Sequence, residues 1–274
     1  MNKSTVVILA VYSKDKFDFL VDCLESLYQQ SFKDFDIMVQ EDGNVSSEIH
    51  LYLQDQLKEK KIIYLGIRDE NLGFDYSLNE LLVLAIKKEY LYFARMDADD
   101  IARPHRLERQ FNFMQRNKDI DVVGTNIREF GHGFSYSKLV TYPTEHRKMF
   151  NFFKRRVPLA HVSAFFRKSF FVKAGLYETE GHINNGDTIM WMKGFENNCC
   201  FANIEYVGVD VRVTEDFFSR RSGIQKTLSD LRNRLQVIQR LKMNRLNAVY
   251  SLLSALVGLS PRAIKKLAYK YLRR

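Results

Sequence analysis

Cysteine, proline and glycine are all scarce in this chain of 274 residues, which has 3, 4 and 13 of them. So little glycine and proline excludes a collagen-like or low-complexity chain. An apolar fraction of 46% with 27% charged residues is typical of a folded globular protein. Two of the cysteines, Cys199 and Cys200, are adjacent. This pattern predicts neither a disulfide framework nor a cysteine metal site, so we expect a reducing compartment.

Long apolar runs are also absent. The longest uncharged stretch, residues 246–261, has 16 residues, whereas a membrane-spanning helix needs about 20 apolar residues. The apolar run at residues 5–12 is too short for a secretory signal, and no small-residue cleavage site follows it. We therefore expect a cytoplasmic protein without a transmembrane helix.

Positive charge is concentrated at the C-terminal end. The net charge is +9, but residues 219–274 hold 14 Lys and Arg against one acid, Asp230, which leaves residues 1–218 with a net charge of −4. Apolar residues in this tail recur at spacings of three and four, as in Leu228, Leu231 and Leu235, which predicts amphipathic helices. A basic helical tail suits nucleic acid, an anionic membrane surface or a solvated helix face.

Upstream of the tail, strand-like and helical segments alternate. Apolar runs at residues 5–12, 36–41, 62–65 and 90–96 are each followed by a segment of helical period, at residues 17–30, 46–60, 74–88 and 104–117. This order predicts an α/β fold with a Rossmann-like, mostly parallel sheet and helices on both faces. After a strand at residues 121–127 the pattern becomes mixed α+β, with a short strand at residues 163–166. We therefore predict one domain over residues 1–222, with halves at 1–117 and 118–222, and a basic amphipathic helical extension, 223–274.

Polar side chains follow three of the predicted strands. Tyr12 ends the first, Asp42 the second, and the run from Arg95 to Asp100 the fourth. Ligands bind at the carboxyl ends of strands in such sheets, and carboxylates gathered there repel one another unless a cation lies among them. The spacing of Asp97 and Asp99 suits one carboxylate for a sugar hydroxyl and one for Mg²⁺ or Mn²⁺, which favours a diphosphate ligand. The structural alternative is a turn and helix N-caps.

The common phosphate-binding loops are absent, since neither GxGxxG after the first strand nor GxxxxGK[ST] occurs. This excludes Rossmann-type dehydrogenases and P-loop enzymes. The residues resemble instead the family 2 glycosyltransferases, which have the GT-A fold, and in particular their bacterial polysaccharide branch (O-antigen and capsule). The resemblance extends from Thr5 to about Gly223. It rests on residues 6–12, 41–44, 71–73, Asn79, 92–101, Pro104, Arg106, Leu107 and Gln110, with Ala10, Ser13 and Glu41 in place of the family's usual Pro, Asn and Asp.

A second set of matches lies downstream. Pro158, His161 and residues 166–168 and 175–177 look like the family's acceptor-side segment. Residues 184–191 are similar to its Glu-Asp-Tyr-Asp-Leu-Trp motif. Aligned on Trp191, the catalytic aspartate of the family falls on Asp187, Gly186 stands in place of the usual Glu, and Ile189 in place of the second Asp. A helix N-cap is the structural alternative for Asp187.

The resemblance implies an inverting transfer from a nucleotide sugar. A UDP-sugar is the expected donor, with GDP- and dTDP-sugars as alternatives, and Asp187 is the implied general base. Asp99 and Asp97 would hold Mn²⁺ or Mg²⁺, and Asp97 would also bind the donor. Asp42 would recognise the nucleobase of the donor. In many relatives a histidine near residues 211–213 helps to bind the metal, and Thr214 stands at that place here.

Further contacts follow from the same resemblance. Donor contacts are implied for Ala10, Val11, Tyr12, Asn71, Gly73, Arg95, Arg220 and Arg221. Acceptor contacts are implied for His161, Tyr177 and Trp191. The structural alternatives are a solvated helix start for the two tail arginines and ordinary core packing for His161 and Trp191.

The implied partners are a nucleotide sugar and a saccharide acceptor carried on a polyprenyl diphosphate. Work on such an acceptor would place the protein on the cytoplasmic face of the inner membrane, with its basic tail on anionic lipid; alternatively, the tail packs on the core. A sugar-phosphate nucleotidyltransferase is a second interpretation, although residues 9–14 lack the glycine-rich loop with which such enzymes normally open. A basic nucleic-acid-binding protein is a third, but the carboxylates at the strand ends argue against a nucleic-acid partner. A catalytically inactive relative would bind nucleotide without turnover.

Overall fold

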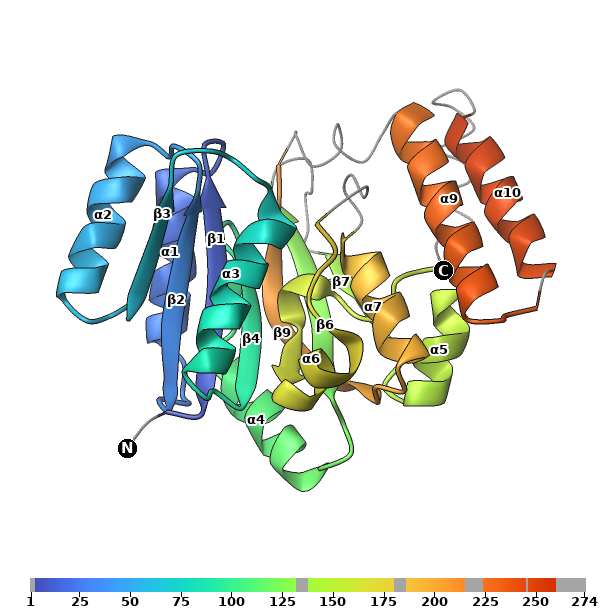
Figure 1. Ribbon diagram of the computed structural model, residues 1–274, viewed down its shortest axis with the longest axis horizontal. Coiled ribbons are helices and arrows are strands. Elements are labelled where there is room, and N and C mark those ends of the chain that lie inside the picture. Colours follow the sequence, from blue (N-terminus) through green and yellow to red (C-terminus); the bar gives the residue numbers. More distant parts are fainter. Residues whose placement is uncertain (1–2, 132–137, 180–185, 215–223, 245, 260–274) are drawn as a thin grey trace.

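The computed structural model describes residues 3–131, 138–179, 186–214, 224–244 and 246–259. In this part of the chain nine strands form one mixed sheet, in the order β3-β2-β1-β4-β8-β6-β9-β5, with β7 paired to β6. The strands are β1 (Thr5–Tyr12), β2 (Phe35–Asp42), β3 (Tyr64–Arg68), β4 (Tyr92–Asp97), β5 (Ile101–Ala102), β6 (Val122–Gly131), β7 (Lys138–Val140), β8 (Phe165–Arg167) and β9 (Phe201–Val213). The helices are α1 (Phe17–Tyr28), α2 (Ser47–Lys58), α3 (Phe74–Lys87), α4 (Arg106–Arg116), α5 (His146–Phe153), α6 (Lys168–Ala174), α7 (Gly186–Glu196), α9 (Ile224–Arg240) and α10 (Leu246–Leu259). Helices cover both faces of the sheet, as predicted (Figure 1).

The strands β1 to β4 form the parallel part of the sheet. β1 lies between β2 and β4, and β3 pairs with β2. In this register Tyr12 lies beside Asp42, Asp42 beside Arg68, and Ala10 beside Asp97. The polar strand ends therefore meet at one edge of the sheet, the upper edge in Figure 1.

Residues of β1 contribute to two separate cores. Val7, Leu9 and Val11 pack with residues of α1, α2 and α4 on one face. Val6 and Ile8 pack with residues of α3, α6 and α7 on the other. Successive side chains of a strand point to opposite faces, so a strand covered on both faces must be apolar at nearly every position. This explains the unbroken apolar run in the sequence.

The second half of the chain departs from the parallel pattern. β8 is antiparallel to both β4 and β6, β5 is antiparallel to β9 and β7 to β6, while β6 and β9 pair in parallel with a register shift near Asn126. Sequence analysis did not resolve α5, α6 or α7. In α7 consecutive residues 189–192 are all buried, so buried side chains extend all the way round one turn of this helix and its sequence shows no helical period.

At the end of the molecule far from β3, α9 and α10 lie side by side (Figure 1). Val237 of α9 packs into the second core, and Arg240 Nε donates to Glu196 Oε1 of α7 at 2.7 Å. Among the residues that the structure describes, no helix has the length and apolar character needed to cross a membrane.

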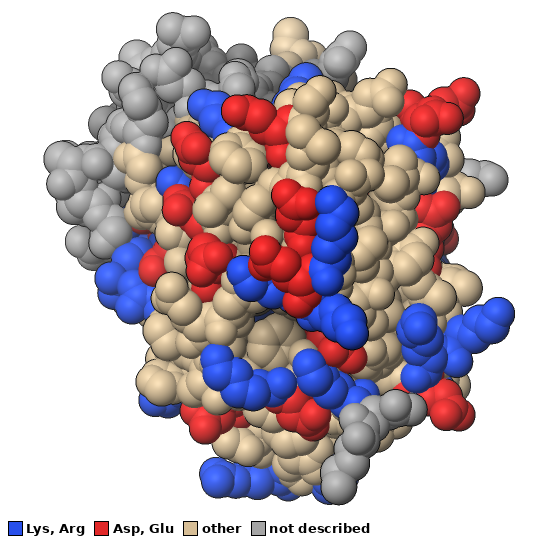
Figure 2. Space-filling model, turned by 90° about the vertical axis from the view of Figure 1, so that its left-hand side faces the viewer, with Lys and Arg blue, Asp and Glu red and all other residues tan. Residues whose placement is uncertain are grey.

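The surface at the β3 and α2 edge of the sheet is divided by charge. Figure 2 faces this edge and shows Asp and Glu mostly in its upper half, with Lys and Arg mostly across its lower half. The upper half corresponds to the carboxyl ends of the parallel strands in Figure 1. Negative side chains therefore gather toward the edge where the polar strand ends meet.

Candidate functional site

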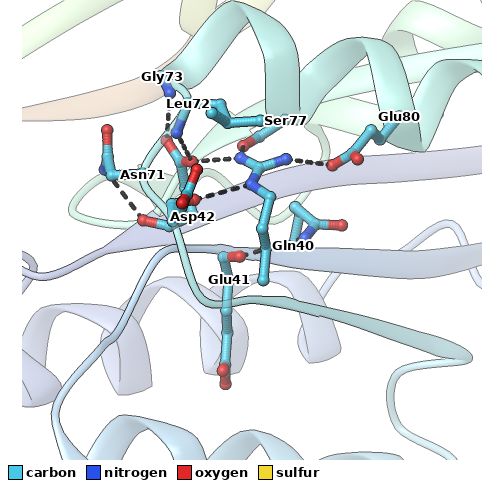
Figure 3. Close-up of polar contacts among 10 residues, drawn as sticks. Gln40, Glu41, Asp42, Asn71, Leu72, Gly73, Ser77 and Glu80 are labelled. Atoms are coloured by element: carbon cyan, nitrogen blue, oxygen red, sulfur yellow. Dashed lines mark hydrogen bonds and ion pairs between the residues drawn. The ribbon is translucent and has the colours of Figure 1, made fainter.

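Asp42 is held at the end of β2 by the segment that precedes α3. Its Oδ1 and Oδ2 accept the backbone N–H groups of Leu72 and Gly73 at 2.9 and 3.0 Å. Asn71 Nδ2 donates to the carbonyl oxygen of Asp42 at 2.9 Å. Figure 3 shows Asp42 pointing toward this segment, whereas the neighbouring Glu41 points to the other side of β2. Asp42, Asn71 and Gly73, three of the predicted donor contacts, therefore form one unit.

Two glycines permit this close packing. Gly43 has φ +79°, and a Cβ there would approach the backbone nitrogen of Asn71 to 2.8 Å. Gly73, with φ +99°, also adopts a conformation that other residues rarely adopt. A larger residue at Gly43 would therefore push the 71–73 segment away from Asp42.

Arg68, at the end of β3, balances the charge of Asp42. It forms ion pairs with Asp42 and Glu80, and its Nη2 donates to Ser77 Oγ at 2.8 Å. The Asp42 side chain is only 4% exposed, and a buried carboxylate is costly without such a partner. Sequence analysis missed Arg68 because it ended this strand three residues early. The rule that ligand contacts follow the carboxyl ends of strands would have found it.

Arg95 orients Asp97 at the end of β4. Its Nη1 donates to Asp97 Oδ2 at 2.7 Å, and its guanidinium carbon lies 4.8 Å from the centroid of the Phe74 ring. Arg95 is only 5% exposed; the carboxylate and the ring face compensate for part of its lost hydration, while its buried Nε has no hydrogen-bond partner among the described residues. These two predicted donor contacts therefore act together.

Asp97, Asp99 and Asp100 each bring a carboxylate oxygen to within 4.8 Å of the others. Burial, reinforced by the charges of Asp99 and Asp97, raises the pKa of Asp100 well above its ordinary value. Mg²⁺ and Mn²⁺ prefer hard oxygen ligands such as these three carboxylates, and a cation would relieve the repulsion among them. These residues therefore fit the implied metal. Sequence analysis assigned no role to Asp100, although it noted the run of acids.

The end of β9 lies against this cluster. The backbone N–H of Arg212 donates to Asp100 Oδ1 at 2.8 Å, and Arg212 Nε donates to the Asp99 carbonyl oxygen at 3.0 Å. Thr214 follows two residues later. The position where many family members carry a histidine therefore comes directly after the strand that touches the acid cluster.

The predicted donor contacts on β1 differ in exposure. Val11 is fully buried and Ala10 is 8% exposed, so these two residues offer little or no surface to a ligand. Tyr12 is half-buried, and its N–H donates to Asp15 Oδ2 at 2.9 Å. Arg220 and Arg221 lie outside the described residues.

His161 and Tyr177, two of the predicted acceptor contacts, touch each other. The distance from His161 Nε2 to the Tyr177 hydroxyl is 2.7 Å, and the ring of Phe74 meets His161 edge-on, with centroids 6.1 Å apart. Burial, helped by the positive charge of Arg95, lowers the pKa of His161 well below its ordinary value. The imidazole is therefore neutral at pH 7.

Three carboxylates act on the Tyr177 hydroxyl. Burial raises its pKa, Arg95 lowers it, and the charges of Asp75, Asp187 and Asp97 raise it further. Asp187 lies half-buried in the first turn of α7 and accepts the N–H of the next residue at 2.6 Å. The charges of Asp97, a predicted donor contact, and of Asp187, the predicted base, therefore both contribute to the raised pKa of Tyr177.

Trp191 is a core residue, which corrects its expected role as an acceptor contact. Its side chain is fully buried. It stacks on Phe166 at a centroid distance of 5.8 Å and meets Phe170 and Phe201 edge-on. Because these rings cover it, Trp191 offers no ring face to a sugar. Its burial follows from the position of α7, whose apolar residues pack into the second core.

Comparisons with known proteins agree with this geometry. A family model described as Glycosyl transferase family 2 matches residues 6–175. The UDP-Gal:alpha-D-GlcNAc-diphosphoundecaprenol beta-1,3-galactosyltransferase of Escherichia coli is 27% identical over 230 residues, which cover 82% of this chain and 80% of that protein. The amylovoran biosynthesis glycosyltransferase AmsE of Erwinia amylovora is 28% identical over 218 residues, 79% of each chain.

A solved structure shows the same fold. The mannosyltransferase PcManGT from Pyrobaculum calidifontis, in complex with GDP-Man and Mn²⁺, has a TM-score of 0.63 at 13% identity, covering 98% of this chain and 80% of that one. This likeness confirms the predicted GT-A fold. Because the family model spans more than half of its length, the chain belongs to glycosyl transferase family 2, as its motifs predict.

Proposed function

We propose that the protein transfers a sugar from a UDP-sugar to a saccharide carried on a polyprenyl diphosphate, with inversion at the anomeric carbon. The observation that carries the proposal is the cluster of Asp97, Asp99 and Asp100 at the end of β4, whose carboxylate oxygens lie within 4.8 Å of one another. The name of the E. coli relative, which specifies a UDP-linked donor and a diphosphoundecaprenol-linked acceptor, supports the substrate classes.

The donor would lie across the ends of β1, β2 and β4. Its base would meet Tyr12 and the unit built on Asp42, whose carboxylate holds the 71–73 backbone and Arg68 in place. Asp97, oriented by Arg95, would bind the ribose or the sugar, and Asp97, Asp99 and Asp100 would hold Mn²⁺ or Mg²⁺. Bound there, such an ion supplies positive charge to the departing diphosphate.

The acceptor would approach from the side of α7. Asp187 would take the proton of the acceptor hydroxyl while the oxygen of that hydroxyl bonds to the anomeric carbon. The bond from that carbon to the phosphate oxygen breaks, and the nucleoside diphosphate leaves. The neutral ring of His161 and the Tyr177 hydroxyl would orient the acceptor through hydrogen bonds.

A transfer assay tests this proposal. Purified protein would be incubated with labelled UDP-sugars and polyprenyl-diphosphate-linked sugars, and NMR would give the anomeric configuration of the product. We expect an inverted linkage, with D187N losing at least a hundredfold in kcat while it still binds nucleotide. The matched control D55N changes an exposed acid of α2. Retention of configuration, or a D187N variant as active as D55N, would contradict the proposal.

The tail would hold the enzyme on anionic membrane. α10 contains no charged residue, and it buries Ser251 and Ala255 while large apolar side chains stay exposed. The exposed ones are Leu246 (74%), Val249 (52%), Leu252 (48%), Leu253 (56%) and Leu256 (63%). Such a surface is typical of an interaction site, and a tail with a net charge of +13 favours anionic lipid as the partner.

Vesicle co-sedimentation tests the membrane proposal. We expect binding to vesicles that contain phosphatidylglycerol and little binding to pure phosphatidylcholine. The double variant L253S/L256S should reduce the bound fraction severalfold. L51S is the matched control, because Leu51 of α2 is 59% exposed and lies far from the tail (Figure 1). Equal binding by the double variant and wild type would show that these leucines of α10 do not contact the membrane.

A further inference from the structure

Asp75 occupies the space that a side chain at position 186 would need. Asp75 lies in the first turn of α3, and Gly186 is the buried first residue of α7. A Cβ added to Gly186 would overlap the carboxylate of Asp75. The absence of a side chain at Gly186 is therefore what lets this carboxylate lie against the start of α7.

The two helices that meet here belong to the two sides of the site. α3 follows directly after residues 71–73, which hold Asp42, and α7 carries Asp187 next to Gly186. Phe74, the neighbour of Asp75, packs under Arg95 and against His161. Asp75 therefore lies at the junction between the donor-side acids and the predicted base.

We infer that Asp75 is a positioning residue, which fixes the start of α7 against α3 and so sets the place of Asp187 relative to the donor. This inference rests on the proposed function. Physical support comes from the helix start, where backbone N–H groups without intrahelical partners and the positive end of the helix dipole favour a carboxylate. The carboxylate of Asp75 lies against Gly186, and Asp187 is the next residue of α7, so the contact is next to the predicted base in the chain.

A double-mutant cycle separates this role from a general loss of structure. D75A removes the carboxylate, and G186A displaces it by adding a Cβ. Because both changes break the same contact, we expect each to lower kcat at least tenfold. The kcat of D75A/G186A should be no lower than that of the less active single variant. Losses that multiply in the double variant, or a D75A variant with wild-type kcat, would overturn the inference.

The conservative variant D75N provides a rescue test. Its amide fills the same space and keeps an oxygen that can accept a hydrogen bond, so we expect its kcat to exceed that of D75A at least threefold. Equal kcat in D75N and D75A would contradict a positioning contact. D55A, an exposed acid of α2, is the matched control and should keep wild-type kcat.

The affinity for UDP and the activity of wild type distinguish a failure of this inference from a failure of the proposed function. Titration of UDP with Mn²⁺ should give affinities within twofold of wild type for D75A, G186A and the double variant, because the donor contacts lie on other side chains. A larger loss of affinity in D75A would make Asp75 part of the donor site and overturn the inference. A wild-type protein that transfers no sugar would refute the proposed function, whereas an active wild type with an equally active D75A would refute only the role of Asp75.

Discussion

Arg95 and Asp97 lie two residues apart on β4, point to the same side of the strand, and are joined by a hydrogen bond of 2.7 Å from Nη1 to Oδ2. The guanidinium is almost completely buried, so its position is fixed by the carboxylate and by the Phe74 ring beneath it. One strand thus supplies both a predicted donor contact and the group that orients it.

The variant R95M tests this pairing. Without the guanidinium, Asp97 loses its orienting partner, and we expect UDP to bind at least tenfold more weakly, a loss of about 1.4 kcal/mol. R109M is the matched control, because Arg109 also lies over an aromatic ring, that of Tyr206, but carries no predicted ligand contact. Calorimetric titration measures both. Unchanged UDP affinity in R95M, in a variant that melts like wild type, would show that Asp97 needs no such partner.

Asp42 and Arg68 should behave as one unit in nucleotide binding. D42N and R68M each disturb the same segment, residues 71–73, so their effects on UDP affinity should not add. We expect a coupling energy of at least about 1 kcal/mol in the double-mutant cycle. Additive losses of UDP affinity would mean that the two residues contribute independently. The position of the 71–73 segment would then not depend on their ion pair.

Trp191 should matter for stability and not for acceptor binding. W191F keeps most of the buried ring volume, so we expect a loss of about 1–2 kcal/mol in the free energy of unfolding. The KM for the acceptor should stay within twofold of wild type. Urea unfolding and steady-state kinetics measure the two effects. An acceptor KM raised tenfold would restore Trp191 as an acceptor contact.

The lowered pKa of His161 predicts a dependence of stability on pH. The unfolded chain takes up a proton at this residue near pH 6.5, whereas the folded protein keeps the ring neutral. The free energy of unfolding should therefore fall as the pH drops below 6.5, by up to about 1.4 kcal/mol per pH unit from this group, until folded His161 is protonated. Urea unfolding at pH 7.5 and 5.5 should show a smaller difference for H161Q than for wild type. H105Q, at a side chain that is 57% exposed, should behave like wild type; an H161Q variant with the wild-type difference would contradict the expectation.

The sequence predicts the parallel half of the fold well, because its strands are buried on both faces. β1 begins and ends where its apolar run does. β3 was placed at residues 62–65 but spans Tyr64–Arg68, since this edge strand contains an exposed Ile67 and ends in a charged residue. That error hid Arg68 from the predicted site.

Contacts between residues distant in the sequence could not be predicted from local pattern. Asp75 and Gly186 come together only because α3 and α7 lie on the same face of the sheet, packed into the same core. Trp191 was misassigned for a related reason, since a motif aligned on it says nothing about the rings that cover it. The clustering of Asp97 and Asp99 could be predicted because Asp97 ends β4 and Asp99 lies in the turn directly after it, where spacing alone brings their carboxylates together.

The most direct test of the proposed donor site is calorimetric titration of UDP, GDP and dTDP, with and without Mn²⁺. It would be repeated on D99A and on the exposed-acid control D55A. We predict that UDP binds wild type and D55A only when Mn²⁺ is present, and that D99A binds it at least tenfold more weakly. If none of the three nucleotides binds wild type at saturating Mn²⁺, the assignment of the acid cluster to a nucleotide-sugar donor is contradicted.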